Sequence, residues 1–401
     1  MIVQVRRRSV QNVLRMERID TINPERVRWC CADRGITVDE LPDLIGINSD
    51  TFQRMMQGAS GLTYRQLQSL AAYFDRGVLF FLERDPVNEI QVHSAHFRTL
   101  ANQKPMLDVQ IKRLIERAVR QRELYLSLLE DLGETAPPVV FPTTNNNPVA
   151  AASAARIWLN LSINVPQAEP LSFNNYRAAI EAKGILVIRS NGYAGPWQID
   201  KQSPICGFSI FEDVCPVIVV KKQPSERRQT FTLMHELGHL MIHRQSNIDT
   251  DDDLYARDGV EREANSFAGH LLVPDEFLEA VQIPNQIVNA SDYEQWLAQY
   301  GRRWGVSIEV ILRRLLDRGR LAQAQYQAYR TWRSQTPYPE TDSGSRQWRH
   351  REPKAVFGEP FVRTVFEALH ARKITLNKAS TYLDNIKIVD VHKLEGHLAS
   401  T

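Results

Sequence analysis

Two histidines and a glutamate form a five-residue pattern, His235-Glu236-Leu237-Gly238-His239, in a stretch that favours helix. His235 and His239 are four residues apart, so both imidazoles leave the same helix face and can take two corners of a tetrahedral zinc site. Glu236 lies beside that site and can accept a proton from a bound water. The pattern therefore indicates a metal-dependent hydrolase. The alternative is a core helix with two hydrogen-bonded histidines, because short patterns recur by chance.

A third ligand is expected from a second helix over residues 261–274. Glu263 belongs to the apolar face of that helix, and a buried carboxylate there needs a partner such as a metal ion. Glu261 points elsewhere and is expected to be solvated. His270 is a rival ligand, and the simpler interpretation is a histidine hydrogen-bonded to a carbonyl near the helix end. His235, His239 and Glu263 would leave a fourth position open for water, as in catalytic zinc sites.

The same two segments resemble a known family. The motif begins at Arg228-x-Thr230-Phe231-Thr232-Leu233-Met234 and runs into the histidine pattern. It is followed by Glu261-Arg262-Glu263-Ala264-Asn265-x-Phe267-Ala268 and by Leu271-Leu272-x-Pro274. These residues look like the ImmA/IrrE family of metallopeptidases. The resemblance implies a soluble bacterial or phage endopeptidase that cleaves a helix-turn-helix repressor, with His235, His239 and Glu263 as ligands and Glu236 as general base.

The identity of the metal ion and of the oxyanion donor stays open, and the acidic segment between the two helices needs an interpretation. A His, His, Glu set accepts several divalent ions, so Zn²⁺ is expected and Mn²⁺ is an alternative. The oxyanion needs a further donor, for which His243 and Tyr255 are unranked candidates. Asp249 and the acidic run 251–253 are expected to form a solvated loop between the two metal helices.

The composition is that of an ordinary globular protein. The chain has 401 residues, 43% hydrophobic and 24% charged, with a formal net charge of +2. These values are ordinary for a globular protein and give no argument for wholesale attraction to nucleic acid or membranes. No apolar run has transmembrane length, and Arg6-Arg7-Arg8 has no apolar segment after it, as a secretory signal would. The four cysteines fit reduced thiols, so a cytoplasmic location is expected.

Residues 21–86 show a succession of short helices that resembles an Xre/Cro-like helix-turn-helix domain. Ser49 is expected to cap its third helix, and Thr63 and Gln66 can form a capping box for the fourth. The third helix of such a domain enters the DNA major groove, so its exposed residues are candidates for recognition of DNA or of a partner. These candidates are Thr51, Gln53, Arg54 and Gln57.

Two features speak against DNA as the ligand of this domain. Pro42 is expected inside the second helix, where it would remove a backbone donor. Residues 21–86 contain seven arginines and nine acidic residues, a net charge of −2, whereas DNA readers carry a basic footprint. A domain that docks onto another domain of the same kind is the competing role.

The chain is therefore expected to be multidomain. An all-α helix-turn-helix domain would precede an α+β HExxH metallopeptidase domain and a small helical C-terminal region. The expected segments are a basic extension (1–20), the helix-turn-helix domain (21–86), a long connecting helix (87–135), a linker (136–148), the peptidase domain (149–320) and the helical region (321–401). One strand of the peptidase domain should lie at the cleft edge, where a substrate segment can add as a further strand.

The function expected is site-specific cleavage of a regulatory protein, a repressor or antitoxin, in stress response or in mobile-element or phage control. The protein substrate is the main expected partner, DNA binding through the N-terminal domain and homodimer formation are open, and no membrane partner is expected. The alternative function is a DNA-binding transcriptional regulator whose peptidase-like domain acts as a sensor. The intact Glu236 favours the enzyme, because binding alone has no use for it.

Overall fold

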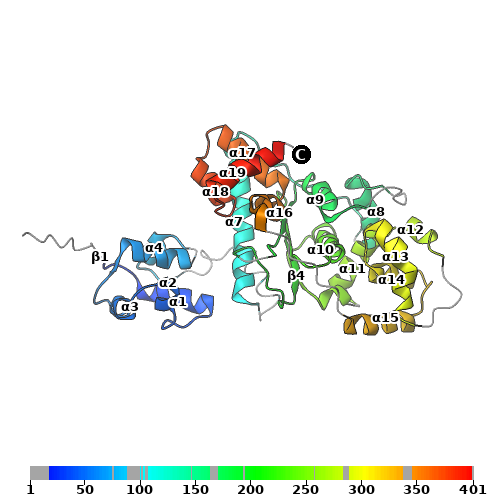
Figure 1. Cartoon of the computed structure of the whole chain (residues 1–401), viewed down its shortest axis with the longest axis horizontal. Helices are drawn as coiled ribbons and strands as arrows, with labels where there is room; N and C mark the ends of the chain where they lie inside the picture. Colours follow the sequence, from blue (N-terminus) through cyan, green and yellow to red (C-terminus); the bar gives the residue numbers. More distant parts are fainter. Residues whose placement is uncertain are drawn as a thin grey trace, which may run out of the picture. The chain divides into compact units, whose positions relative to one another are not determined.

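The computed structural model describes residues 18–74, 76–87, 100, 103, 107–145, 147–162, 170–192, 195–256, 258–282, 289–336 and 346–399. The chain forms two compact units, Met1–His93 and Ser94–Thr401, which are described separately (Figure 1). Most of the expected basic extension lies outside the described residues. Within the described part, no helix combines the length and the apolar composition needed to cross a membrane.

The described part of the first unit is mainly helical. Two short strands, β1 (Arg18–Ile19) and β2 (Leu62–Thr63), pair in antiparallel fashion. The helices are α1 (Pro24–Arg34), α2 (Leu41–Ile45), α3 (Ser49–Met56), α4 (Tyr64–Tyr73) and the 3₁₀ helix η1 (Val78–Phe81). Phe52, Leu67 and Phe81 are fully buried in a core of their own, which explains why this unit is compact.

Local capping in the first unit differs in part from the expectation. The capping box of Thr63 and Gln66 is present at the start of α4. Asn48, not Ser49, caps α3, because its side chain accepts a hydrogen bond from the Thr51 amide. Helix α2 begins at Leu41, so Pro42 lies in the first turn, where a backbone donor has no helical partner to lose. The objection to DNA binding that rested on Pro42 is therefore wrong.

The second unit contains a four-stranded mixed sheet. Its strands are β3 (Leu186–Arg189), β4 (Ile205–Ile210), β5 (Val217–Val220) and β6 (Asn247–Thr250), in the order β3-β5-β4-β6. Strands β3 and β5 are parallel, whereas β4 is antiparallel to both of its neighbours. Every residue of β4 and β5 is buried, as expected for strands that are covered on both faces.

Helices cover both faces of this sheet. On one face, Val187, Ile218 and Val220 pack in a core with the helices α8 (Pro148–Trp158), α9 (Phe173–Glu181), α10 (Glu226–Gly238) and α11 (Gly259–Leu272). The alternate residues Leu186, Ile188, Val217 and Val219 point to the other face, as the period of two in a strand requires. That face is covered by α7 (Val109–Asp131) and by helices from the C-terminal part of the chain.

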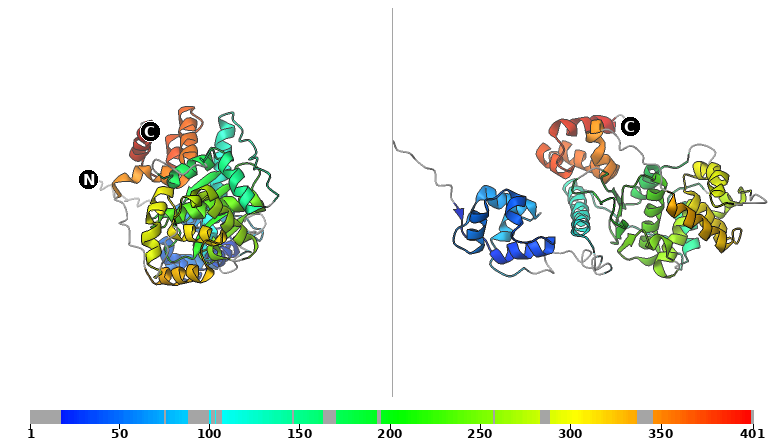
Figure 2. Two further views of the ribbon diagram at one scale, coloured as in Figure 1. Left: turned by 90° about the vertical axis from the view of Figure 1, so that its right-hand side faces the viewer. Right: turned by 60° about the horizontal axis from the view of Figure 1, so that its bottom comes forward.

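The C-terminal helices are α16 (Glu352–Phe357), α17 (Glu359–His370), α18 (Leu376–Tyr382) and α19 (Ile388–Ala399), preceded by the 3₁₀ helix η4 (Arg346–Arg351). They lie beside α7 in the views of Figures 1 and 2, where they are orange to red and α7 is cyan. The fully buried Phe361 and Val365 share a core with α7 and the sheet. Helix α7, which lies in the expected connecting segment, and these C-terminal helices thus belong to the same compact unit as the sheet.

The expected linker also contacts this unit. The Val139 amide donates to the Asp213 carbonyl at 2.7 Å, and Phe141 is buried against the core around α8. The remaining helices of the unit are α12 (Asp275–Glu279), α13 (Asp292–Trp304), α14 (Ile308–Asp317) and α15 (Gln323–Gln335). The chain is thus multidomain and mostly helical with a small mixed sheet, an architecture compatible with an α+β peptidase domain.

Candidate metal centre

Helix α10 positions the two histidines. Its N-cap is Ser225, whose hydroxyl accepts a hydrogen bond from the Arg228 amide, and the helix continues as the π-helical turn η2 (His239–His243). The Nε2 atoms of His235 and His239 lie 3.0 Å apart, and both side chains are almost completely buried. π-helical turns are rare and often occur at functional sites. The spacing of four residues therefore places both imidazoles at one point, as expected.

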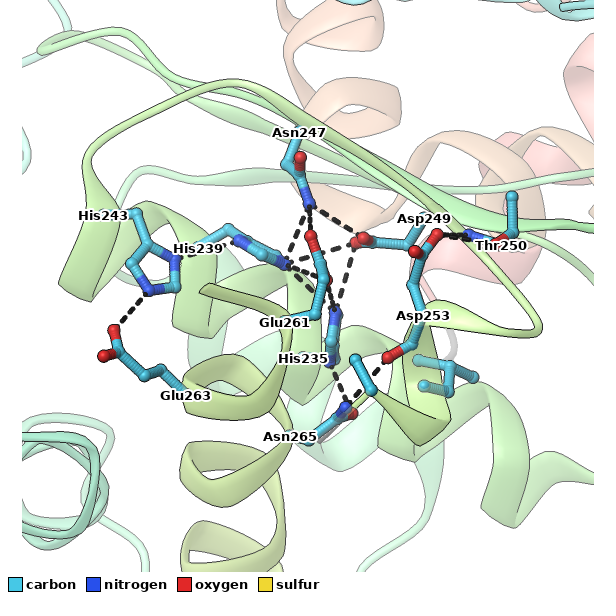
Figure 3. Close-up of polar contacts among 12 residues, drawn as sticks. His235, His239, His243, Asn247, Asp249, Thr250, Asp253, Glu261, Glu263 and Asn265 are labelled. Carbon is cyan, nitrogen blue, oxygen red and sulfur yellow. Dashed lines mark hydrogen bonds and ion pairs between the residues drawn. The ribbon is translucent and has the colours of Figure 1, made fainter. Parts of the chain in front are cut away.

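Two carboxylates complete a group around these nitrogen atoms (Figure 3). Glu261 Oε2 lies 3.2 Å from His235 Nε2 and 3.3 Å from His239 Nε2. Asp249 Oδ2 lies 3.3 Å and 3.5 Å from the same two atoms. One ligand atom from each of the four residues lies within 4.8 Å of the others, a separation that fits a single bound cation.

The structure corrects the expected third ligand. Glu263 lies outside the group, with its Oε2 atom 3.1 Å from His243 Nε2 and its side chain 46% exposed. The side chain of Glu261 is only 19% exposed and faces the histidines. The two glutamates are two residues apart on α11, so they leave opposite sides of the helix. The side that faces α10 is the one that carries Glu261 and the buried Asn265.

The acidic segment after η2 is also placed differently from the expectation. Asp249 belongs to strand β6 and is fully buried, because β6 pairs with β4 instead of forming a solvated loop. Asp251 is half-exposed and forms an ion pair with Arg228. Asp253 caps the segment by accepting hydrogen bonds from the amide and hydroxyl of Thr250. Only Asp249 therefore joins the metal-binding group.

Each histidine is held by a partner on its second ring nitrogen. His235 Nδ1 lies 3.0 Å from Asn265 Oδ1, and the Asn265 amide group donates to the Asp253 carbonyl. Because Asn265 Oδ1 can only accept, His235 Nδ1 must be the protonated nitrogen, and Nε2 keeps a lone pair for a metal. This arrangement fixes the orientation and the tautomer of a ligand histidine.

His239 is held by a chain of two residues. Its Nδ1 lies 3.0 Å from His243 Nδ1, and His243 Nε2 lies 3.1 Å from Glu263. A proton on His239 Nδ1 that is donated to His243 leaves His239 Nε2 as the metal-facing acceptor. Both ring nitrogens of His243 are thus engaged, and the ring of Tyr255 lies 3.9 Å from the Arg330 guanidinium. His243 therefore has no ring nitrogen left for an oxyanion, and the oxyanion donor stays open.

Sequence reasoning missed Asn247, which also points into the group. Its amide nitrogen donates to Asp249 Oδ1 at 2.8 Å and to Glu261 Oε1 at 3.0 Å, and it lies 3.0 Å from His239 Nε2. These contacts fix the two carboxylates relative to the histidines. Asn247 and Asp249 are both on β6, two residues apart, so their side chains share one face of the strand.

Glu236 is fully buried beside this group. Within the described residues, neither of its carboxylate oxygens has a hydrogen-bond partner of good geometry, although Ser209 and Asp249 lie close enough to influence it. Burial, followed by the negative charge of Asp249, raises the pKa of Glu236 well above its ordinary value. The carboxylate packs against Gly207 of β4, where an added Cβ atom would stand 2.7 Å from Glu236 Oε1. A buried carboxylate without a donor is costly unless it has a function or an unseen partner.

The electrostatics of the group favour a bound cation. Burial alone would lower the pKa of His235, but Asp249 and Glu261 outweigh it and raise that pKa to about 9. Burial likewise opposes the charge on Glu261, yet its contacts with the His235 and His239 imidazoles lower its pKa far below the ordinary value. Two imidazole nitrogens with two carboxylates are a donor set that suits zinc and also manganese.

The rival ligand His270 lies at another place on α11. Its Nδ1 atom is 2.8 Å from the Ser266 carbonyl, an interaction that satisfies a histidine in the last turn of a helix. Burial and the nearby Arg314 lower its pKa. His270 is not a member of the metal-binding group. The simpler of the two interpretations of this residue therefore agrees with the structure.

Comparisons with known proteins gave a family model and a relative. Residues 180–316 match the family model of peptidase M78, described as the IrrE N-terminal-like domain. A stretch of 82 residues is 34% identical to the "Uncharacterized immunity region protein 2" of Bacillus phage phi105. That match covers 20% of this chain and 51% of the phage protein, so the chain spans about half the length of this relative. The family model supports the ImmA/IrrE metallopeptidase family for the segment that carries the metal-binding group, and the phage relative supports the same family.

Proposed function

We propose that the chain is a metal-dependent endopeptidase that cleaves a regulatory protein at a specific site. The observation that carries this proposal is the fully buried Glu236, whose two oxygens have no hydrogen-bond partner of good geometry in the described structure, next to the group of His235, His239 and Glu261. A structural zinc site has no need for such a carboxylate. A hydrolase needs it to accept a proton from the attacking water.

His235, His239 and Glu261 would hold the ion, with Asp249 as a further carboxylate on the same cation. Zinc is the proposed ion and manganese is the alternative. When bound, such an ion acidifies a water molecule and polarises the scissile carbonyl. Asn247 would keep the two carboxylates in place, while Asn265 and His243 hold the two imidazoles in the tautomer that binds a metal.

Glu236 would take the proton from water and return it to the leaving amine. Gly207 supports this role because it has no Cβ atom, which leaves room for the Glu236 carboxylate against β4. Strand β6 is at the edge of the sheet and pairs with β4 alone among the described strands. An extended substrate segment can add to such an edge, which would bring its peptide bonds next to Asn247 and Asp249.

A regulatory protein is the proposed substrate class. The name of the phage relative refers to an immunity region, and the ImmA/IrrE resemblance implies peptidases that cleave helix-turn-helix repressors. The first unit would be a helix-turn-helix domain that recognises DNA or a partner domain through α3. The exposure of Gln53, Arg54 and Gln57 supports this role, and Thr51 is half-buried. A repressor or antitoxin in stress response or in mobile-element or phage control would be the target.

The test uses Glu236→Gln, which is nearly isosteric but cannot accept the proton. Parent and variant, loaded with zinc or manganese, are incubated with the purified product of the adjacent gene, with and without DNA. We expect one new fragment with the parent only and equal metal content in both proteins. Equal cleavage by both proteins would rule out Glu236 as the base. Absence of cleavage by either would favour a DNA-binding regulator whose peptidase-like domain acts as a sensor.

A further inference from the structure

A cavity lies beside helix α10, the helix that carries His235 and His239. It has a volume of about 260 Å³ and is lined by residues of α10, α14, α15 and the 3₁₀ helix η3 (Asp253–Tyr255). Arg228 and Phe231 of α10 form part of its wall, seven and four residues before His235. At about 1.5 Å per residue, Phe231 is about 6 Å along the helix axis from that histidine. None of the four residues of the metal-binding group lines the cavity.

The charges on the wall favour an anionic ligand. One carboxylate, Glu309, faces four guanidinium groups, those of Arg228, Arg313, Arg330 and Arg333. Glu309 is already engaged, with its Oε1 atom 3.5 Å from Arg330 Nε and 3.4 Å from the Tyr326 hydroxyl. A guanidinium has five N–H donors, and its fork matches a carboxylate or phosphate. Other acceptors use part of this donor capacity: Arg228 pairs with Asp251, Arg313 donates to the Leu254 and Ala256 carbonyls, and Arg333 lies 4.0 Å from Glu294. The four guanidinium groups together carry more N–H donors than these contacts and Glu309 occupy.

Two helix N-termini add to this positive field. Ser225 caps α10 and Ser307 caps α14, and both residues line the cavity. Both helices have ten or more residues, and the N-terminus of a helix carries a partial positive charge. The partial positive charge of the two helix N-termini thus has the same sign as the charge of the arginine side chains in the cavity wall.

The size of the cavity limits the ligand. A cavity of about 150 Å³ holds one benzene molecule, and drug-sized ligands occupy about 300–1,000 Å³. A volume of about 260 Å³ therefore suits an acidic side chain or a small organic anion, and not a nucleotide. Phe231, Leu254 and Val310 give the wall an apolar part that can take a short hydrocarbon stem.

We propose that this cavity binds a small anionic group, a carboxylate or phosphate, with a short apolar stem. The group reaches the cavity either as a free small anion or as an acidic side chain of a bound polypeptide. The proposal goes beyond the proposed function, because anion binding is measured without cleavage and can succeed or fail independently of it.

The test is calorimetric titration of the metal-loaded full-length protein with three probes. They are inorganic phosphate, glutamate capped as its N-acetyl methylamide, and the equally capped glutamine as a neutral isostere. We expect at least one anionic probe to bind once per chain and the glutamine probe to bind at least about tenfold more weakly. A charged hydrogen bond contributes about 1.5–3 kcal/mol, and about 1.4 kcal/mol corresponds to a factor of ten.

Variants locate the binding. Arg330→Met keeps the apolar stem and should weaken the anionic probe by about tenfold or more, while Arg313→Gln serves as a second variant. Arg302→Met changes an exposed arginine on α13 outside the cavity and should leave binding unchanged. Thermal unfolding of each variant shows whether it is folded, so that loss of binding cannot be confused with loss of structure.

The outcomes separate the two sources of the anion. Phosphate binding at least as tight as that of capped glutamate indicates a free small anion. Binding of capped glutamate without phosphate indicates an acidic side chain of a polypeptide. Failure of both anionic probes overturns the proposal. It is also overturned if binding persists in folded Arg330→Met and Arg313→Gln but disappears when the metal is chelated, because the anion would then sit on the metal.

Discussion

Glu261 and Glu263 provide a matched pair for testing the metal-binding group, since both are glutamates on the same helix. Glu261→Ala removes an oxygen within 3.3 Å of both histidine nitrogens, whereas Glu263→Ala removes only the partner of His243. Changes outside the ligand shell typically weaken metal binding by about 10–100-fold. We therefore expect more than about a hundredfold loss for Glu261→Ala and about tenfold or less for Glu263→Ala, measured by competition with a chelator.

Comparable losses in the two variants would show that Glu263 approaches the ion after all. Circular dichroism provides the control for folding in both proteins. A third variant, His270→Ala, should retain the parent affinity, because His270 contacts the Ser266 carbonyl and not the group.

The difference between these glutamates also shows how far sequence reasoning reaches at the scale of residues. The spacing of His235 and His239 is a local property of one helix, so their convergence could be predicted. The choice between Glu261 and Glu263 depends on which side of α11 faces α10, and only the packing of the two helices decides that. Asn265, one turn after Glu261, was the available signal, because a buried asparagine on that side needs a polar partner.

Asp384 offers a pH-dependent test away from the metal. It lies between α18 and α19 with a φ of 66°, a conformation that asparagine also tolerates. Burial raises its pKa from 3.8 to about 6, against the opposing charge of Arg117. Because the folded-state pKa is the higher one, the protonated carboxyl stabilises the fold below about pH 4, and this contribution is lost as the pH rises through about 6.

Asp384→Asn should therefore raise the free energy of unfolding at pH 7.5 and have little effect near pH 4. Discounted for partial exposure to solvent, the gain is on the order of 1 kcal/mol. Urea unfolding at the two pH values measures it. An equal effect at both values would mean that the titration of Asp384 is not its cause.

At the scale of elements, Gly207 allows β4 to pack closely against α10, the helix that carries His235 and His239. A Cβ atom there would stand 2.7 Å from Glu236 Oε1 and 2.8 Å from the Val219 carbonyl, both too close for a real contact. Gly207→Ala should therefore force the strand and helix apart and lower the free energy of unfolding by about 1–3 kcal/mol. Cleavage should fall with it, because Glu236 loses its place.

Gly396 in α19 is the matched control for this substitution. No atom lies within 4 Å of the position of its Cβ, so Gly396→Ala meets no obstacle. Alanine in a helix interior is favoured over glycine by about 0.5–1 kcal/mol, so this variant should be slightly more stable than the parent. Parent-like stability of Gly207→Ala in the same urea titration would contradict the proposed fit of Glu236 against β4.

Elements differ in how well the sequence predicts them, for a physical reason. The cap of Thr63 and Gln66 and the long helix α7 depend on neighbouring residues. The cap is where the sequence places it, and α7 covers the later part of the expected connecting helix, residues 87–135. Strand β6 has only four residues and several acids around it, so its pattern resembles a solvated loop. Its place in the sheet comes from pairing with β4, which is about 40 residues away in sequence and leaves no local trace.

At the scale of the whole molecule, the sheet depends on helices from both ends of the second unit. The face that carries Val187, Ile218 and Val220 packs on α8–α11, whereas the opposite face packs on α7 and α16–α19. The family match, residues 180–316, therefore contains the metal-binding group but lacks the cover of one sheet face. A fragment cut at the expected domain boundaries, residues 149–320, should expose Leu186, Ile188, Val217 and Val219 to water.

Fragments test this dependence. Residues 94–401 keep both layers of helices and lose only the first unit, which has a core of its own. This fragment should unfold cooperatively in urea and bind one zinc ion per chain with the affinity of the full protein. Residues 149–320 should aggregate or unfold without a cooperative transition, because a large exposed apolar face favours association. If fragment 149–320 is monomeric, unfolds cooperatively and binds metal with full affinity, α7 and α16–α19 are not needed to hold the metal site. If it fails these tests while fragment 94–401 passes them, α7 and α16–α19 are part of the fold that holds the metal.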